Sequence, residues 1–182
     1  MVKVVNIVGS GSLETEFDLK SVSADLGSIA DYDPKKYPGM YVRLDENTPL
    51  ITLYRTGKYI ITGANSKDQV HSTRKQFLNH LAENGMVPTP VDEWFRIQNV
   101  VCTAELGKSL NLNALAIGLG LEKTEYEPEQ FPGLIYRSAD FDSVVLLFAS
   151  GRIVITGSPD LDSAERTFRM LSEEVTDILN IN

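Results

Sequence analysis

The stretch YEPEQFPGLIYRS, residues 126–138, is the second copy of a stretch that occurs earlier in the same chain, YDPKKYPGMYVRL at residues 32–44. Both copies keep a Tyr, two Pro, a Gly and an Arg at the same positions. Proline fixes its own φ angle and restricts the residue before it, so each copy predicts a rigid loop. The residue before the second proline is aromatic in both copies, Tyr37 in one and Phe131 in the other. A rigid loop that occurs twice predicts an internal structural repeat.

The repetition continues on both sides of this loop. VVNIVGSGSL around Asn6 matches IQNVVCTAEL around Asn99, and LITLYRTGKYIITGA matches VVLLFASGRIVITGS. The two loop aromatics are 94 positions apart and the two asparagines are 93 apart, which indicates one inserted residue. We therefore expect one continuous domain of two repeats, residues 1–87 and 94–182, joined by a proline-containing linker at 88–93.

Hydrophobic periodicity predicts the same elements in each repeat. Val and Ile enrichment predicts a first strand, alternation predicts three more strands, and apolar spacings of three and four predict two helices. The predicted spans are a strand at 2–10, a short helix at 18–26, strands at 40–44, 50–54 and 58–63, a capped helix from 66 to 85, and a second long helix at 161–179. This order predicts an α+β fold, in which one curved antiparallel sheet carries helices on its back and leaves its other face uncovered.

Composition argues against several classes of protein. The sequence contains no window of 18 or more apolar residues, so we expect no membrane-spanning helix. The N-terminus lacks the pattern of a signal peptide. A single cysteine, Cys102, excludes an internal disulfide framework and suits a reducing compartment. The two histidines, His71 and His80, have no paired carboxylate or cysteine nearby, and the GSGS at 9–12 lacks the pattern of a phosphate loop. We expect neither an enzyme nor a bound metal or cofactor.

The negative charge lies in the second half of the chain. The net charge is −8, and residues 92–182 hold 7 Lys and Arg against 15 Asp and Glu, while residues 1–91 are balanced. An acidic protein is usually a poor candidate for binding nucleic acid. Two interpretations remain open: a solvated, salt-tolerant surface, or an acidic half that meets a basic partner.

Strand alternation predicts which side chains share the uncovered face. In KYIITG, Ile60 and Thr62 point one way while Tyr59 and Ile61 point the other. The residues expected on one face in both repeats are Asn6, Val8, Ser10, Ile60, Thr62, Asn99, Val101, Thr103, Val154 and Thr156. They predict a binding face that combines small apolar groups with Asn and Thr. In the alternative they form a core under the helices, where both asparagines would need buried partners.

These residues carry a family resemblance over nearly the whole chain. NIV and NVV, YEPEQFPGLIYR, LLFASGRIVITG and the weaker LYRTGKYIITGA resemble the core of the TATA-box-binding protein (TBP) family, and the second-repeat loop is similar to that of archaeal members. The resemblance implies a saddle of two pseudo-symmetric halves whose concave sheet binds the minor groove of A/T-rich promoter DNA and kinks it. The family is itself a standard example of this mode of binding. An archaeal-type member would act in the cytoplasm, on the nucleoid.

The resemblance implies roles for particular residues. Donors to the A N3 and T O2 acceptors would be Asn6, Asn99, Thr62 and Thr156. Flat apolar contacts would come from Val8, Val101, Ile60 and Val154. The aromatic wedges that kink the duplex would be Tyr37, Tyr54, Phe131 and Phe148. The cations on the phosphates would be Arg43, Lys58, Arg137 and Arg152.

The chain departs from the family pattern at several of these places. Tyr37 and Tyr54 replace the usual phenylalanines. A phenolic oxygen between bases needs a hydrogen-bond partner, or it is left without one at a cost of roughly 1–3 kcal/mol. Asn65 and Pro159 stand where the family has lysine, and acidic groups lie at 140–142 where cations are expected. We therefore expect weaker or more context-dependent DNA binding. The alternative is a divergent TBP paralogue that acts mainly as a protein-interaction or sequestering module.

The two proline loops differ in charge. Glu127 and Glu129 lie in the second loop, whereas Lys35 and Lys36 lie in the first. The resemblance implies that the acidic loop binds the transcription factor B family, which links the protein to the RNA polymerase preinitiation complex. The charge difference would then tell that factor which end of the molecule to contact. In the alternative, the two loops are simply solvated and differ in charge.

Overall fold

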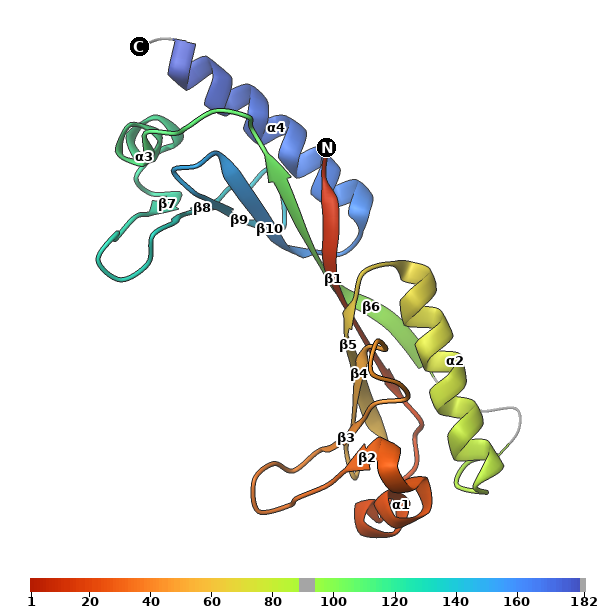
Figure 1. The fold of residues 1–182 in the computed structure, drawn as a ribbon. Helices are drawn as coiled ribbons and strands as arrows, with labels where there is room; N and C mark the ends of the chain where they lie inside the picture. The colour runs from red at the N-terminus through yellow and green to blue at the C-terminus, as the bar shows by residue number, and fades with distance from the viewer. Residues whose placement is uncertain (89–93, 181–182) are drawn as a thin grey trace. The chain divides into compact units, whose positions relative to one another are not determined.

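A computed structural model describes residues 1–88 and 94–180. The first repeat contains β1 (Lys3–Ser12), α1 (Leu19–Leu26), the 3-10 turn η1 (Gly27–Ile29), β2 (Ala30–Asp31), β3 (Met40–Val42), β4 (Leu50–Leu53), β5 (Lys58–Ala64) and α2 (Lys67–Glu83) (Figure 1). The second contains β6 (Trp94–Glu105), α3 (Leu112–Leu119), β7 (Thr124–Glu125), β8 (Leu134–Arg137), β9 (Val144–Leu147), β10 (Arg152–Ser158) and α4 (Leu161–Asn180). Apart from η1, the order of helices and strands is the same in both repeats. The repeated order agrees with the sequence-based prediction, which did not include β2 and β7.

The strands form one ten-stranded sheet in the order β2-β3-β4-β5-β1-β6-β10-β9-β8-β7. The predicted α+β class with a single antiparallel sheet is confirmed. The described chain divides into two compact units, one of residues 6–98 and one of residues 1–5 with those from 99 onward. Strands β1 and β6 each contribute to both units. The predicted linker lies mostly outside the described residues, so the repeat boundaries at 87 and 94 remain a prediction.

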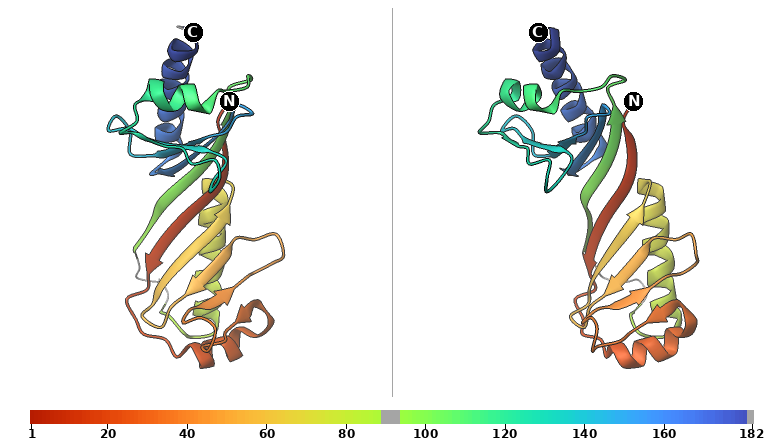
Figure 2. Two further views of the ribbon diagram at one scale, coloured as in Figure 1. Left: turned by 90° about the vertical axis from the view of Figure 1, so that its left-hand side faces the viewer. Right: turned by 60° about the vertical axis from the view of Figure 1, so that its left-hand side comes forward.

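In the first unit, α2 covers one face of the strands (Figure 2). Tyr59 on β5 is fully buried and packs against Phe77 of α2, with the ring centroids 5.6 Å apart. Ser66 caps the helix by accepting a hydrogen bond from the Gln69 backbone N–H at 3.2 Å. The Gln69 side chain in turn accepts from the backbone of Asn65, one residue before the cap, rather than from the cap itself. The cap predicted from the sequence is thus present with one partner shifted.

In the second unit, α4 covers the strands in the same way (Figure 2). Ile153 and Ile155 of β10 are fully buried, as are Leu171 and Val175 of α4. Cys102 is a fully buried residue on the same side of β6, and burial raises the pKa of its thiol. Within the described ranges, no helix has both the length and the apolar character needed to cross a membrane.

Candidate nucleic-acid interface

The two faces of the strands differ in burial in each unit. In β5, Tyr59 and Ile61 are fully buried on the α2 side, whereas Ile60 and Thr62 are only half-buried. β10 repeats this pattern. We call the half-buried side the open face; it carries Asn6, Val8, Lys58, Ile60 and Thr62 in the first unit and Asn99, Val101, Arg152, Val154 and Thr156 in the second. The alternative that these side chains form a core under the helices is therefore wrong, because α2 and α4 pack on the other side.

Each open face contains an asparagine that is held by the neighbouring strand. Oδ1 of Asn6 accepts a hydrogen bond from the Gly63 backbone N–H at 2.8 Å, and Oδ1 of Asn99 accepts from Gly157 at 2.8 Å. The Nδ2 amino group lies on the other side of each amide. In residues 1–88 and 94–180, no acceptor pairs with either amino group. Each asparagine therefore presents a donor in a fixed orientation.

The glycines that hold these asparagines lie at irregularities of the sheet. The register of β1 on β5 shifts between Ile7 and Gly9, and the register of β10 on β6 shifts between Ile155 and Ser158. Gly63 has a φ of 93° and Gly157 has a φ of 83°, values that side chains other than glycine rarely adopt. A bulge frees an N–H group from the regular ladder. The repeated Thr-Gly of β5 and β10 thus directs one N–H group at the asparagine of each repeat.

At the end of each open face, two aromatic rings lie together. Tyr37, from the loop before β3, and Tyr54, after β4, have ring centroids 6.2 Å apart and ring planes at 58°. Phe131 and Phe148 form the equivalent pair at 5.9 Å and 68°. All four rings are half-buried. The structure therefore brings together the predicted wedge residues as one pair per repeat.

The glycine of each Pro-Gly sequence makes room for these rings. A Cβ atom on Gly39 would lie 2.9 Å from the Tyr37 ring and 3.1 Å from the Tyr54 ring. A Cβ atom on Gly133 would lie 2.7 Å from Phe131 and 3.1 Å from Phe148. Contacts this short do not occur without displacement of the rings. Ring packing therefore explains the glycine of each Pro-Gly sequence.

The tyrosine hydroxyls of the first repeat bind each other, with the two Oη atoms 2.6 Å apart. This hydrogen bond, together with burial, raises the pKa of Tyr54 to about 12. Of the two alternatives for a phenolic oxygen at this place, a partner or none, the structure shows the first, because each hydroxyl is the partner of the other. Tyr41 of β3 stacks on the Tyr37 ring at 5.2 Å and 8°, which supports it from below.

The four predicted phosphate-binding cations are exposed, but they are not equally free. Lys58 and Arg152 begin β5 and β10, and the part of the chain that the structure describes offers their side chains no partner. Arg43 donates to the Thr48 carbonyl oxygen at 2.8 Å. Arg137 forms an ion pair with Glu125. Two cations are thus available without rearrangement, one in each repeat.

The acidic loop of the second repeat is exposed. Glu127 and Glu129 lie between β7 and β8 with exposed side chains. The Glu127 carbonyl oxygen accepts hydrogen bonds from the backbone of Gln130 and Phe131, so this loop is tied to the wedge residue. In the first repeat, Lys35 is exposed and Lys36 lies 3.5 Å from Asp33. The two loops therefore have the same turn and opposite charge.

Sequence reasoning missed Tyr41 and Trp94 as members of this region. Trp94 starts β6 with 44% of its surface exposed, and it lines a hollow of about 790 Å³ with Tyr54, Lys58 and Ile60. Tyr41 stands between Met40 and Val42 in the predicted strand, and this alternation could have placed it on the face opposite to them. The structure shows Met40 and Val42 buried and Tyr41 half-buried. Trp94 had no such signal, because the matching position of the first repeat is Met1.

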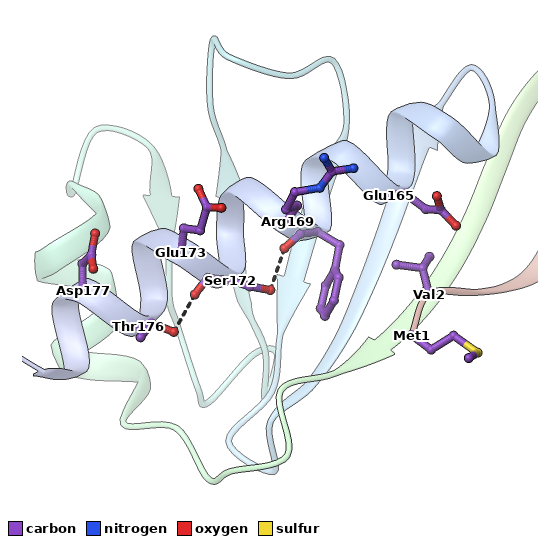
Figure 3. Close-up of a pocket in the computed structure, with 9 residues that line it drawn as sticks. Met1, Val2, Glu165, Arg169, Ser172, Glu173, Thr176 and Asp177 are labelled. Carbon is purple, nitrogen blue, oxygen red and sulfur yellow. Dashed lines mark hydrogen bonds between the residues drawn. The ribbon is translucent and has the colours of Figure 1, made fainter.

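A second hollow, of about 810 Å³, lies on the helix side of the second unit. Figure 3 shows Glu165, Arg169 and Glu173 of α4 around it, with Val2, which lies just before β1, near Glu165. In the first unit the residue that matches Val2 is Phe95, whose ring stacks on Tyr59 at 6.0 Å. The second unit thus has Val2 at the place that a phenylalanine ring occupies in the first unit. None of the predicted DNA-binding residues lines the hollow.

Comparisons with known proteins show similarity over both repeats. The family model described as transcription factor TFIID, or TATA-binding protein (TBP), matches residues 1–84 and 94–178. TATA-box-binding protein C of Halobacterium salinarum is 50% identical over 179 residues, which are 98% of this chain and 99% of the relative. TATA-box-binding protein 1 of Haloferax volcanii is 42% identical over 181 residues, which are 100% of this chain and 95% of the relative.

A solved structure gives the same result for the fold. The structure titled Methanococcus jannaschii TBP matches with a TM-score of 0.82 at 37% sequence identity, and the match covers 97% of this chain and 98% of that one. The similarity therefore extends over both repeats and not over one element alone.

Proposed function

Because this chain belongs to the TATA-box-binding protein family, we propose that it is an archaeal-type transcription initiation factor that binds the minor groove of A/T-rich promoter DNA. The observation that carries the proposal is the pair of oriented amides. Gly63 and Gly157 hold the oxygens of Asn6 and Asn99, so each Nδ2 group is left to donate. In the minor groove, A·T and T·A pairs present only acceptors, A N3 and T O2. Two fixed donors on a largely apolar face complement such a groove.

The remaining open-face residues support the same mode of binding. Val8, Val101, Ile60 and Val154 provide apolar contact along the groove, and Thr62 and Thr156 add hydroxyl donors. A guanine would place its 2-amino group against this surface without an acceptor, so A·T pairs are favoured. The ring pairs at the two ends wedge between base steps and kink the duplex.

The proposal includes protein partners. The exposed carboxylates of Glu127 and Glu129 lie on the loop that carries Phe131, and they pair with basic side chains of a transcription factor B family protein. That factor then connects the bound promoter to the RNA polymerase preinitiation complex. The site of action is the nucleoid DNA in the cytoplasm of an archaeal cell.

A salt titration of DNA binding tests the proposal. We assign four cations to the phosphates, Arg43, Lys58, Arg137 and Arg152, and Arg137 is already paired with Glu125. Each neutralised phosphate contributes about −0.9 to the slope of log affinity against log salt, so we expect a slope no steeper than about −4. The measurement is a mobility-shift or anisotropy titration with an A·T-rich duplex and a G·C-rich duplex of equal length.

Two arginine variants provide the matched comparison. Arg152→Ala should flatten the slope by about 1. Arg166→Ala, which removes an exposed arginine of α4 on the helix side, should leave it unchanged. A slope of about −7 or steeper would contradict this account of the cations, and equal affinity for both duplexes would contradict the proposed function itself.

A second candidate function rests on the ion pair between Arg137 and Glu125. This pair occupies one expected phosphate contact, and Asp140 and Asp142 place more negative charge at the same end of the sheet. Under this alternative, the protein is a TBP paralogue with weakened DNA binding that mainly binds or sequesters protein partners. A mobility shift with and without transcription factor B separates the two functions. A shift that requires no partner supports promoter binding, and factor B binding without any DNA shift supports the alternative.

A further inference from the structure

The hydroxyl pair of Tyr37 and Tyr54 is a polar group at the end of an otherwise apolar face. The two Oη atoms are 2.6 Å apart, so one hydroxyl donates to the other. Each hydroxyl has one proton and two lone pairs, so the pair keeps one O–H donor and unused acceptor positions. No other side chain or backbone group in the described ranges binds either hydroxyl. The pair can therefore both donate to a ligand and accept from one.

The second repeat provides the internal reference for this pair. Phe131 and Phe148 are arranged almost identically, at 5.9 Å and 68° against 6.2 Å and 58° for the tyrosines. Gly39 and Gly133 make room for the rings in the same way. The ring pairs of the two repeats therefore have similar geometry, and they differ in that only the first pair carries hydroxyl groups.

The minor groove offers one group that distinguishes these two ends. A·T pairs present only acceptors, whereas a G·C pair adds the guanine 2-amino donor. An apolar ring pair leaves that donor without a partner, and an unpartnered donor is costly. The tyrosine pair can accept from it. We propose that the Tyr37–Tyr54 hydroxyl pair is a recognition site for the guanine 2-amino group, so that the first repeat accepts a G·C pair at the outer position where the second repeat requires A·T.

This inference rests on the proposed function, and it gives the protein a direction on DNA. When a site has G·C at one outer position and A·T at the other, the protein binds with Tyr37 and Tyr54 of the first repeat at the G·C pair. This preference is distinct from the difference in charge between the two proline loops. The preference depends on two oxygen atoms.

Equilibrium binding to duplexes with a common A·T core tests the inference. The outer pairs are A·T at both ends, G·C at one end, or G·C at both ends. We expect the duplex with one G·C end to bind within about threefold of the all-A·T duplex. We expect G·C at both ends to cost about tenfold, or about 1.4 kcal/mol, because the phenylalanine end then faces an amino group. Inosine in place of guanine lacks this group and should restore the affinity.

The variant Tyr37→Phe with Tyr54→Phe isolates the hydroxyls, since both rings are kept. For this variant, G·C at one end should already cost about tenfold relative to the all-A·T duplex, and inosine should remove that cost. Circular dichroism and thermal unfolding check that the variant folds. The inference is overturned if the wild-type protein binds the all-A·T duplex but loses about tenfold for G·C at one end, or if the variant tolerates one G·C end as the wild type does. Failure to bind the all-A·T duplex overturns the proposed function as well.

Discussion

Replacing Asn6 and Asn99 together by aspartate is expected to lower affinity for an A·T-rich duplex by at least roughly 100-fold while the protein remains folded. Each aspartate keeps an oxygen that accepts from Gly63 or Gly157, where the asparagine oxygen lies at 2.8 Å. The amino group, however, becomes a second carboxylate oxygen that faces the acceptors of the minor groove. Two donors are lost and two repulsive contacts replace them. Fluorescence anisotropy with a labelled duplex measures the change, and thermal unfolding checks the fold.

A matched control separates this effect from added negative charge. Asn79 on α2 and Asn113 on α3 are exposed on helices, and neither lies on an open face. Their double replacement by aspartate adds the same charge and should change affinity by less than about threefold, since exposed charges farther away than a Debye length are screened. If both double variants lose affinity equally, the loss comes from net charge and the oriented-amide account fails.

Replacing Phe131 and Phe148 together by alanine is expected to abolish the kink at the second-repeat end and to weaken binding by about 100-fold. The two rings lie 5.9 Å apart with Gly133 packed beneath them, so they act as one wedge. Stacking of an aromatic side chain on a base contributes about 1–3 kcal/mol per ring. Without the rings, nothing offsets the free-energy cost of unstacking the base step. Energy transfer between dyes at the two duplex ends measures the bend, and a titration measures the affinity.

The control for this wedge is another phenylalanine of the same unit. Phe168 lies on α4, on the helix side, and lines the hollow beside Val2. Phe168→Ala should leave both the bend and the affinity within about twofold of the wild type, even if it lowers stability. A Phe131 and Phe148 double variant that still bends the duplex as the wild type does would show that these rings are not the wedge.

Much of the fold could be predicted because the sequence repeats itself. The offset of 93 or 94 positions gave two independent readings of each strand and long helix, and the alternation in KYIITG correctly separated Ile60 and Thr62 from Tyr59 and Ile61. Strands β2 and β7 escaped prediction because two residues are too few to show alternation.

The site was less predictable because its key contacts depend on register and ring orientation. Asn6 accepts a hydrogen bond from Gly63, which is 57 positions away in the sequence, at a bulge that no local sequence pattern predicts. The hydroxyl bond between Tyr37 and Tyr54 depends on how two loops place their rings. The ion pair of Arg137 with Glu125 joins two neighbouring strands, and sequence similarity alone assigned that arginine to phosphate. Residue identity indicated the candidates, and only the structure shows which groups remain free.

The most direct test of minor-groove recognition is to exchange every A·T pair of the duplex core for inosine·cytosine. This exchange changes the major groove but keeps the minor groove free of the 2-amino group, with acceptors at the same positions. The account predicts that the A·T and inosine·cytosine cores bind with affinities within about twofold of each other, and that a G·C core binds at least roughly 100-fold more weakly. An inosine·cytosine core that binds as poorly as the G·C core would show that the guanine 2-amino group is not what the protein discriminates against, and would contradict the account.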